Sequence, residues 1–163
     1  MIIRTNEFVH TKKYVLDVLR AKDRNIKIKK VDEVFYPYAL VVYSIKMKNP
    51  KSLMNRKMLC VIDLATGRGA IGDQDPPLVE IEVDDVQVVE PLLSEKELDE
   101  KAHDFMIRTV LSKIRVLYIP EIVLEKKEYF YKMYYIIHCK DIYKKDYFLL
   151  ADPMDTSFTF IEH

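Results

Sequence analysis

Hydrophobic and polar residues alternate along two stretches of the chain in the way that β-strands require. In residues 38–48 and 130–140, every second position is apolar or aromatic. Because successive side chains of a strand point to opposite faces of a sheet, these positions predict the buried face of each strand. The two predicted core sets are Ala39, Val41, Tyr43, Ile45 and Met47 in the first strand, and Tyr131, Met133, Tyr135, Ile137 and Cys139 in the second.

Two further stretches place apolar residues three or four positions apart, which predicts amphipathic helices at residues 6–22 and 95–113. Ser94 and Glu97 have the spacing of a capping box at the start of the second helix. After each helix come short runs rich in Val, Ile, Tyr and Phe, which are typical of strands. The pattern therefore predicts a helix followed by strands, twice along the chain.

One constant spacing of 92 residues relates the two halves, since it places Val15 on Ile107 and Tyr43 on Tyr135. Self-similarity at a fixed spacing is the signature of an internal repeat. We therefore predict an α+β fold made of two tandem α-β-β-β repeats. Each antiparallel sheet would be covered by the helix of its own repeat, so that the two halves would superpose.

The predicted repeats set the predicted domain organisation. The first repeat takes residues 1–72 and the second takes residues 94–163, within either one compact domain or two. Residues 73–93 form an acidic linker between them. In this linker the alternation VEIEV predicts one more strand.

Three glycines, the only ones in the chain, have the G-x-G-x-x-G spacing of a dinucleotide-binding loop at Gly67, Gly69 and Gly72. Such a loop must lead into a helix whose N-terminal amides hold the pyrophosphate. The paired prolines at 76–77 favour extended backbone before them and prevent that helix. We therefore predict a strand, a turn with Gly67 at positive φ, and a returning strand, with no nucleotide bound.

The same hairpin carries a family resemblance. A helix, then strands, then Asp63, Thr66 and Gly67 in the pattern V-x-D-x-x-T-G resembles the PepSY-type or cystatin-like α-β-β-β module, whose final hairpin has a similar Asp-x-x-Thr-Gly. In the second half Asp152 and Thr156 correspond, without the glycine. The resemblance implies a binding or inhibitory module and not a catalyst.

Cys60 and Cys139 are the only cysteines, too few for a four-cysteine zinc site or a disulfide scaffold. Both lie in apolar runs, which predicts buried thiols in a reducing compartment. The apolar runs are shorter than the ~18 residues of a spanning helix, and the first residues lack the apolar segment of a secretory signal. We expect a cytoplasmic protein with no membrane span.

The residue pattern predicts no catalytic, metal-binding or cofactor-binding residues. Asp99 and His103 are four positions apart on the second predicted helix and could share a metal, but no third ligand follows at a fixed spacing, so a solvated helix face is favoured. His138 and Cys139 are adjacent in a strand, so their side chains point to opposite faces. An enzyme whose site is assembled from distant residues is the third alternative for function.

The favoured function is a non-enzymatic binding or regulatory module that acts through protein-protein contacts, with a protein partner or as a homo-oligomer. The second face of the two long strands mixes apolar with polar residues and is the predicted partner surface. It consists of Tyr38, Leu40, Val42, Phe130, Tyr134 and Ile136. The alternative is that the sheets bury these faces against each other.

Charge is uneven along the chain although the net charge is zero. Residues 1–31 carry nine Lys or Arg against three acids, and residues 73–104 carry twelve acids against two Lys. Nucleic-acid binding is therefore the alternative function, because lysines attract phosphates and neighbouring tyrosines stack on bases. The predicted nucleic-acid patch consists of Lys12, Lys13, Arg20, Lys27 and Lys29.

Overall fold

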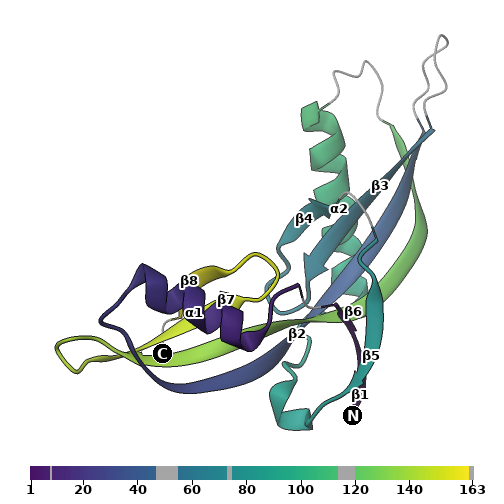
Figure 1. Cartoon of the computed structure of the whole chain (residues 1–163). Coiled ribbons are helices and arrows are strands. Elements are labelled where there is room, and N and C mark those ends of the chain that lie inside the picture. The colour runs from purple at the N-terminus through teal and green to yellow at the C-terminus, as the bar shows by residue number, and fades with distance from the viewer. Residues whose placement is uncertain (8, 47–54, 73–74, 114–119, 162–163) are drawn as a thin grey trace. The chain divides into compact units, whose positions relative to one another are not determined.

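The computed structural model describes residues 1–163 except 8, 47–54, 73–74, 114–119 and 162–163 (Figure 1). Hydrogen bonding connects the described strands in the order β4-β3-β2-β6-β1-β5, with β7 paired to β6 and β8 to β7. The described elements are β1 (Ile2–Asn6), α1 (Lys12–Lys22), β2 (Lys27–Lys46), β3 (Asn55–Asp63), β4 (Gly69–Gly72), β5 (Leu78–Glu82), the 3-10 turn η1 (Asp85–Gln87), α2 (Glu95–Lys113), β6 (Glu121–Lys140), β7 (Asp146–Asp152) and β8 (Ser157–Ile161).

These elements form two compact units, and each unit is built from segments that are far apart in the sequence. The long strands β2 and β6 contribute one part to each unit. Unit 1 comprises residues 1–36, 78–89 and 131–163, and unit 2 comprises residues 37–77 and 90–130.

The core of unit 2 lies between α2 and the strands β2 and β3. The two strands pair antiparallel, with Val41 opposite Cys60. The apolar stripe of α2 is fully buried on this sheet and consists of Leu98, Ala102, Met106 and Val110. The predicted core face of β2 is confirmed, because Ala39, Val41, Tyr43 and Ile45 are all buried. Met47 lies outside the described residues.

The core of unit 1 lies between α1 and the strands β6 and β7. Helix α1 begins after Thr11, whose hydroxyl accepts a hydrogen bond from the backbone N–H of Tyr14. Its buried residues Val15 and Leu19 belong to the same apolar cluster as the inner face of β6 and β7. The predicted core face of β6 is confirmed at Met133, Tyr135, Ile137 and Cys139, while Tyr131 is half-buried.

Strands β1 and β5 complete unit 1. They pair antiparallel, with Ile3 opposite Ile81, and β1 meets β6 in parallel at Thr5 and Tyr131. The extra strand predicted from the VEIEV alternation is therefore confirmed as β5. The first helix was expected from residue 6, but residues 2–6 are paired as a strand and the Thr11 cap sets the start of α1 at Lys12.

The predicted fold class is wrong. The described residues form a mostly β structure with two α-helices and one continuous hydrogen-bonded strand order, and not two tandem α-β-β-β repeats. Helix, long strand and hairpin do follow one another twice along the chain, but α1 packs on β6 and β7, and α2 packs on β2 and β3. An apolar stripe defines which side of a helix is buried and carries no information about the sheet that buries it. The domain boundaries at 1–72, 73–93 and 94–163 stay a prediction.

The hairpin predicted around the glycines is confirmed. Strand β3 pairs antiparallel with β4, with Ile62 opposite Gly69, and Gly67 has a φ of 78° in the turn between them. A residue with a Cβ is disfavoured in this left-handed region, which explains the glycine. Among the described residues, no helix has the length and apolar character needed to cross a membrane.

Candidate functional site

Helix α2 in unit 2 positions the polar groups of the candidate site. Ser94 caps its start, since its hydroxyl accepts from the backbone N–H of Glu97 at 3.2 Å and donates to the Glu97 carboxylate at 3.0 Å. The predicted capping box is thereby confirmed. Leu98 and Ala102 on the buried stripe hold the helix on the sheet, so the next positions round the helix, Asp99 and His103, lie beside the strands.

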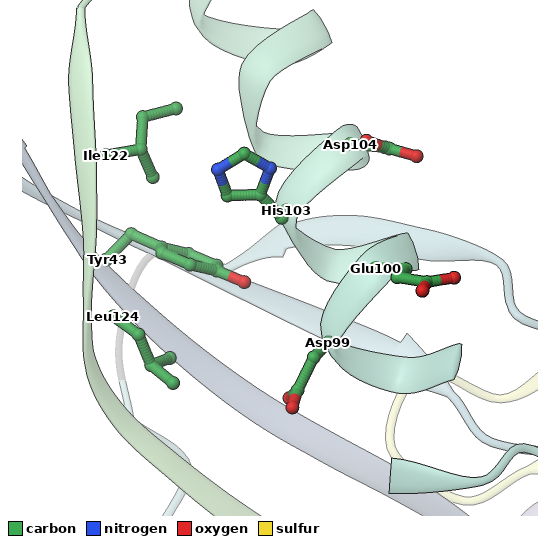
Figure 2. A pocket seen from close by; sticks show the side chains of 7 residues that line it. All are labelled: Tyr43, Asp99, Glu100, His103, Asp104, Ile122 and Leu124. Atoms are coloured by element: carbon green, nitrogen blue, oxygen red, sulfur yellow. The ribbon is translucent and has the colours of Figure 1, made fainter. Parts of the chain in front are cut away.

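An open cleft of about 530 Å³ runs along this edge of α2, and we call it the α2 cleft. Figure 2 shows Ile122 and Leu124 of β6 opposite the helix, the ring of Tyr43 from β2 between the two sides, and Asp99 and His103 projecting from α2. Its lining residues are Tyr43, Asp99, Glu100, His103, Asp104, Ile122 and Leu124. One wall is thus apolar. On the helix side, Asp99 and His103 project toward β6, whereas Glu100 and Asp104 project to the other side of α2 in this view.

Tyr43 forms the floor of the α2 cleft. The residue is 4% exposed, and its ring meets the ring of His103 edge to face, with centroids 6.4 Å apart. Burial is the main cause that raises the pKa of Tyr43 to about 12, and the nearby Cys60 and Asp99 raise it further. The phenol is therefore protonated at neutral pH, so it is a hydrogen-bond donor and not a base.

Lys127 of β6 ties the strand to the first turns of α2. Its ammonium lies 2.9 Å from carboxylate oxygens of both Glu95 and Asp99. The hydrogen bonds to these two carboxylates raise the pKa of Lys127 well above its ordinary value. Because Asp99 is engaged by a cation in this way, its carboxylate serves to position the cleft wall.

The other candidate reactive side chains, those of the two cysteines and of His138, are buried or paired. Cys60 and Cys139 are fully buried, and burial raises the pKa of Cys60 to about 11 and raises that of Cys139. His138 lies on the other face of β6 from Cys139, as predicted, and its Nε2 is 3.1 Å from Asp146. Across the described residues, no three His, Cys, Asp or Glu side chains gather as metal ligands.

The residues of the predicted partner surface fall in both units. Leu40 and Phe130 are only 1% and 5% exposed, so the chain itself covers them. The ring of Phe130 stacks on Tyr38 in unit 2, with centroids 5.7 Å apart. The remaining members Tyr38, Val42, Tyr134 and Ile136 are half-buried. Their contact with a partner stays a prediction.

The residues of the predicted nucleic-acid patch are all exposed and lie in unit 1. Lys12, Lys13 and Arg20 are on α1, and Arg20 pairs with Asp17 at 3.6 Å. Lys27 and Lys29 begin β2 beside Lys140 of β6. Nucleic-acid binding by this patch stays a prediction.

Sequence reasoning singled out two residues on the helix side of the α2 cleft, without assigning a site to them, and missed the apolar wall. Asp99 and His103 stood out by their spacing on a helix. Ile122 and Leu124 lie in the half of β6 that precedes the predicted strand at 130–140. Their alternating apolar positions in EIVLEKK could have extended that strand, but no pattern in the sequence sets its position opposite α2.

In comparisons with known proteins, no protein-family model, no curated protein and no solved structure matches the chain.

Proposed function

We propose that this protein is a non-enzymatic binding module that holds a basic and apolar segment of a partner protein in the α2 cleft. The observation that carries the proposal is the pairing of two unlike walls. Leu124 is 47% exposed beside Ile122 on one wall, and the acidic residues Asp99, Glu100 and Asp104 belong to the helix side. An exposed apolar surface rimmed by charge is typical of a protein-binding site.

The chemistry of the walls defines the bound segment. An apolar side chain of the segment would cover Ile122 and Leu124, which removes apolar surface from water. A lysine or arginine beside it would reach Glu100 and Asp104, whose side chains are exposed. The cleft is open along the helix, so an extended segment fits it better than an enclosed small molecule does.

The groups in the cleft support binding rather than catalysis. The phenol of Tyr43 is held protonated, Asp99 is bound to Lys127, and the two thiols of the chain are buried in the sheet cores. A nucleophile needs an activating base within hydrogen-bond reach. Cys139 Sγ donates to the Ile137 carbonyl, and its other partner, Tyr147, has its pKa raised to about 12 and is protonated at neutral pH. His103 meets Tyr43 through its ring edge, which fits a packing role.

Fluorescence anisotropy with synthetic peptides tests the proposal. The probes are a short labelled peptide of alternating lysines and leucines and the matching peptide with glutamates in place of lysines. The full chain is expected to bind the lysine peptide and not the glutamate peptide. The double variant Glu100→Gln, Asp104→Asn is expected to bind it about fivefold to tenfold more weakly, since each exposed charge contact contributes modestly.

A charge-matched control is available on β5 in unit 1, where Glu80 and Glu82 are exposed. Glu80→Gln, Glu82→Gln is expected to leave peptide affinity unchanged. An apolar wall variant, Leu124→Ser, is expected to weaken binding without unfolding, because Leu124 is half exposed. Equal binding of both peptides, or equal loss in the β5 control, would reject the α2 cleft as the site.

A further inference from the structure

The hairpin between β6 and β7 in unit 1 ends in a hydrogen-bonded turn that carries apolar side chains. Asp141 organises the turn, because its Oδ1 accepts hydrogen bonds from the backbone N–H of Tyr143 at 2.8 Å and of Lys145 at 2.9 Å. Lys144 completes it with a φ of 61°. The turn lies beyond the described part of β8, which ends opposite Phe148. Figure 1 shows this turn as the loop that joins β6 to β7.

Two large apolar side chains at this turn face solvent. Ile142 is 64% exposed and Tyr143 is 77% exposed. A fixed backbone that presents adjacent apolar side chains to water is unfavourable for the isolated chain. The two side chains are adjacent at the end of a hairpin, where one partner surface can cover both.

Lysines surround the turn. Lys144 and Lys145 belong to it, and Lys140 ends β6. At the start of β2, Lys29 lies close to Lys140, and Lys27 lies close to Lys29. The acids among them are engaged within the fold, since Asp141 bonds the turn and Asp146 lies 3.1 Å from His138 and 4.0 Å from Lys140. Nearby, Lys30 pairs with Asp32 at 3.4 Å.

The lysines are close enough to disturb one another. The pKa of Lys29 is lowered, mainly by its interaction with the side chain of Lys140. The charge of Lys27 lowers this pKa further, and the charge of Asp146 raises it. Positive charge is therefore concentrated at this end of unit 1 beyond what the local acids balance. An anionic partner would relieve that repulsion.

We propose that the β6–β7 turn docks on the anionic surface of a lipid bilayer, with Ile142 and Tyr143 inserted among the headgroups and the lysines on the lipid phosphates. Tyrosine is favoured at the membrane interface, and lysine side chains reach headgroups from a partly inserted segment. A nucleic acid would stack on Tyr143 but would gain nothing from the aliphatic Ile142. A bilayer accepts both side chains.

A single tryptophan tests this docking directly, because the chain contains none. The full chain with Tyr143→Trp is mixed with phosphatidylcholine vesicles, with or without phosphatidylglycerol. Its emission is expected to shift to the blue, and to be quenched by brominated acyl chains, only with the anionic vesicles. No shift with anionic vesicles, or a shift with a short single-stranded oligonucleotide in their place, would overturn the proposal.

Charge variants of the reporter locate the contact. Lys144→Asn, Lys145→Gln is expected to weaken binding to anionic vesicles by about 25-fold at low salt, since each lysine near such a surface contributes about fivefold. The matched control Lys12→Gln, Lys13→Gln removes the same charge at the other end of unit 1, where the N–H of His10 bonds Pro153. It is expected to change binding by less than about twofold. Equal losses in the two variants would reject the turn as the contact.

Insertion itself has a separate readout. Ile142→Ser in the reporter is expected to weaken vesicle binding by about tenfold, because an isoleucine side chain no longer leaves water. Circular dichroism is expected to be unchanged, since Ile142 is exposed in the fold. Unchanged vesicle affinity in this variant would show that the turn does not insert, which contradicts the proposal.

Discussion

Two hairpin turns, one in each unit, have the same hydrogen bonds on different sequences. In unit 2 the turn after β3 uses Asp63, whose Oδ1 accepts from Ala65 N at 2.8 Å and whose carbonyl accepts from Gly67 N at 2.7 Å. In unit 1 the turn after β7 uses Asp152, whose Oδ1 accepts from Met154 N at 2.8 Å and whose carbonyl accepts from Thr156 N at 2.9 Å. The aspartate therefore determines this turn in both places.

The carbonyl after each aspartate holds the segment that leads into a helix. Leu64 accepts hydrogen bonds from the N–H groups of Leu92 and Leu93, just before α2. Pro153 accepts from the N–H of His10, just before α1. Each turn is thus the point where a helix entry is attached to the sheet that the helix covers.

The turns differ at the residue with positive φ. The first has Gly67 at 78° and the second has Thr156 at 56°. A β-branched residue is strained in this region, whereas glycine is not. The unit 1 turn therefore keeps its form at a conformational cost, and its aspartate has the additional support of Lys132, whose ammonium lies 2.6 Å from Asp152 Oδ2.

The largest difference between the turns should follow removal of the aspartates. Asp152→Ala is expected to lower the free energy of unfolding by about 2–3 kcal/mol, because Met154 N loses its acceptor and the partly buried Lys132 loses its carboxylate. Asp63→Ala should cost about 1–2 kcal/mol, since only turn hydrogen bonds are lost. Urea denaturation measures both.

The isosteric Asp152→Asn variant keeps an oxygen acceptor for Met154 and removes the charge that Lys132 contacts, so it should lie between wild type and Asp152→Ala. If the alanine variants of the two turns lose equal stability, the ion pair with Lys132 contributes nothing, and the comparison fails at that point.

A smaller effect is expected from a side chain at the glycine. Gly67→Val should lower the free energy of unfolding by about 1–2 kcal/mol, because a β-branched residue is forced to positive φ. Its Cβ would meet Lys101 Cδ at 2.8 Å, which a flexible side chain relieves. Gly67→Asn is the control and should cost less, since asparagine tolerates this region. Thermal unfolding that ranks the two variants in the opposite order would contradict the backbone explanation.

The reverse substitution should stabilise the other turn. Thr156→Gly is expected to raise the free energy of unfolding by about 0.5 kcal/mol, as the relief of backbone strain exceeds the entropy that glycine loses on folding. The same urea experiment measures the gain. A loss of stability would mean that the threonine side chain contributes more than its backbone costs.

The smallest expected difference between the two turns is in how their contribution to stability changes at acidic pH. Asp155 Oδ1 accepts from Ser157 N at 2.9 Å, where the first turn has the Thr66 hydroxyl accepting from Arg68 N at 3.3 Å. The Ser157 side chain and backbone lower the pKa of Asp155. Its contribution to stability is therefore complete above the ordinary aspartate pKa and is lost as the pH falls through the lowered value.

The contribution is at most about 0.5 kcal/mol, because Asp155 is exposed and screened by solvent. Asp155→Thr gives unit 1 the uncharged acceptor of the first turn. The stability difference between this variant and wild type should disappear in acid, and a difference that persists at low pH would exclude Asp155 as its source.

Local features of the fold were predictable from local patterns. The alternation at Tyr43 and Ile45 gave the buried face of β2, the Ser94 and Glu97 pair gave the start of α2, and Gly67 gave a turn. Each of these depends on interactions within a few residues. The candidate site could not be predicted in this way, because the pairing of β6 with the distant strand β2 brings its apolar wall at Ile122 and Leu124 to α2.

The pairing of helices with sheets could not be predicted for the same reason. Val15 and Leu19 would be equally well buried by any apolar sheet face, and the sequence contains two such faces of similar composition. In the structure, α1 packs on the face that is more distant in the sequence, which belongs to β6 and β7. The strand at residues 2–6 was likewise missed, and its last residue was assigned to the first helix, because its pairing with β5 lies outside any local window.

The exchange of helices between the two halves of the chain sets an order for folding during synthesis. Every residue of unit 2 has been made once Phe130 is added, whereas unit 1 waits for residues 131–163. At about 5–20 residues per second, α1 leaves the ribosome several seconds before the strands that cover it. Its apolar stripe stays exposed to water through that interval, so we expect the nascent N-terminal segment to be the main binding site for a chaperone during synthesis.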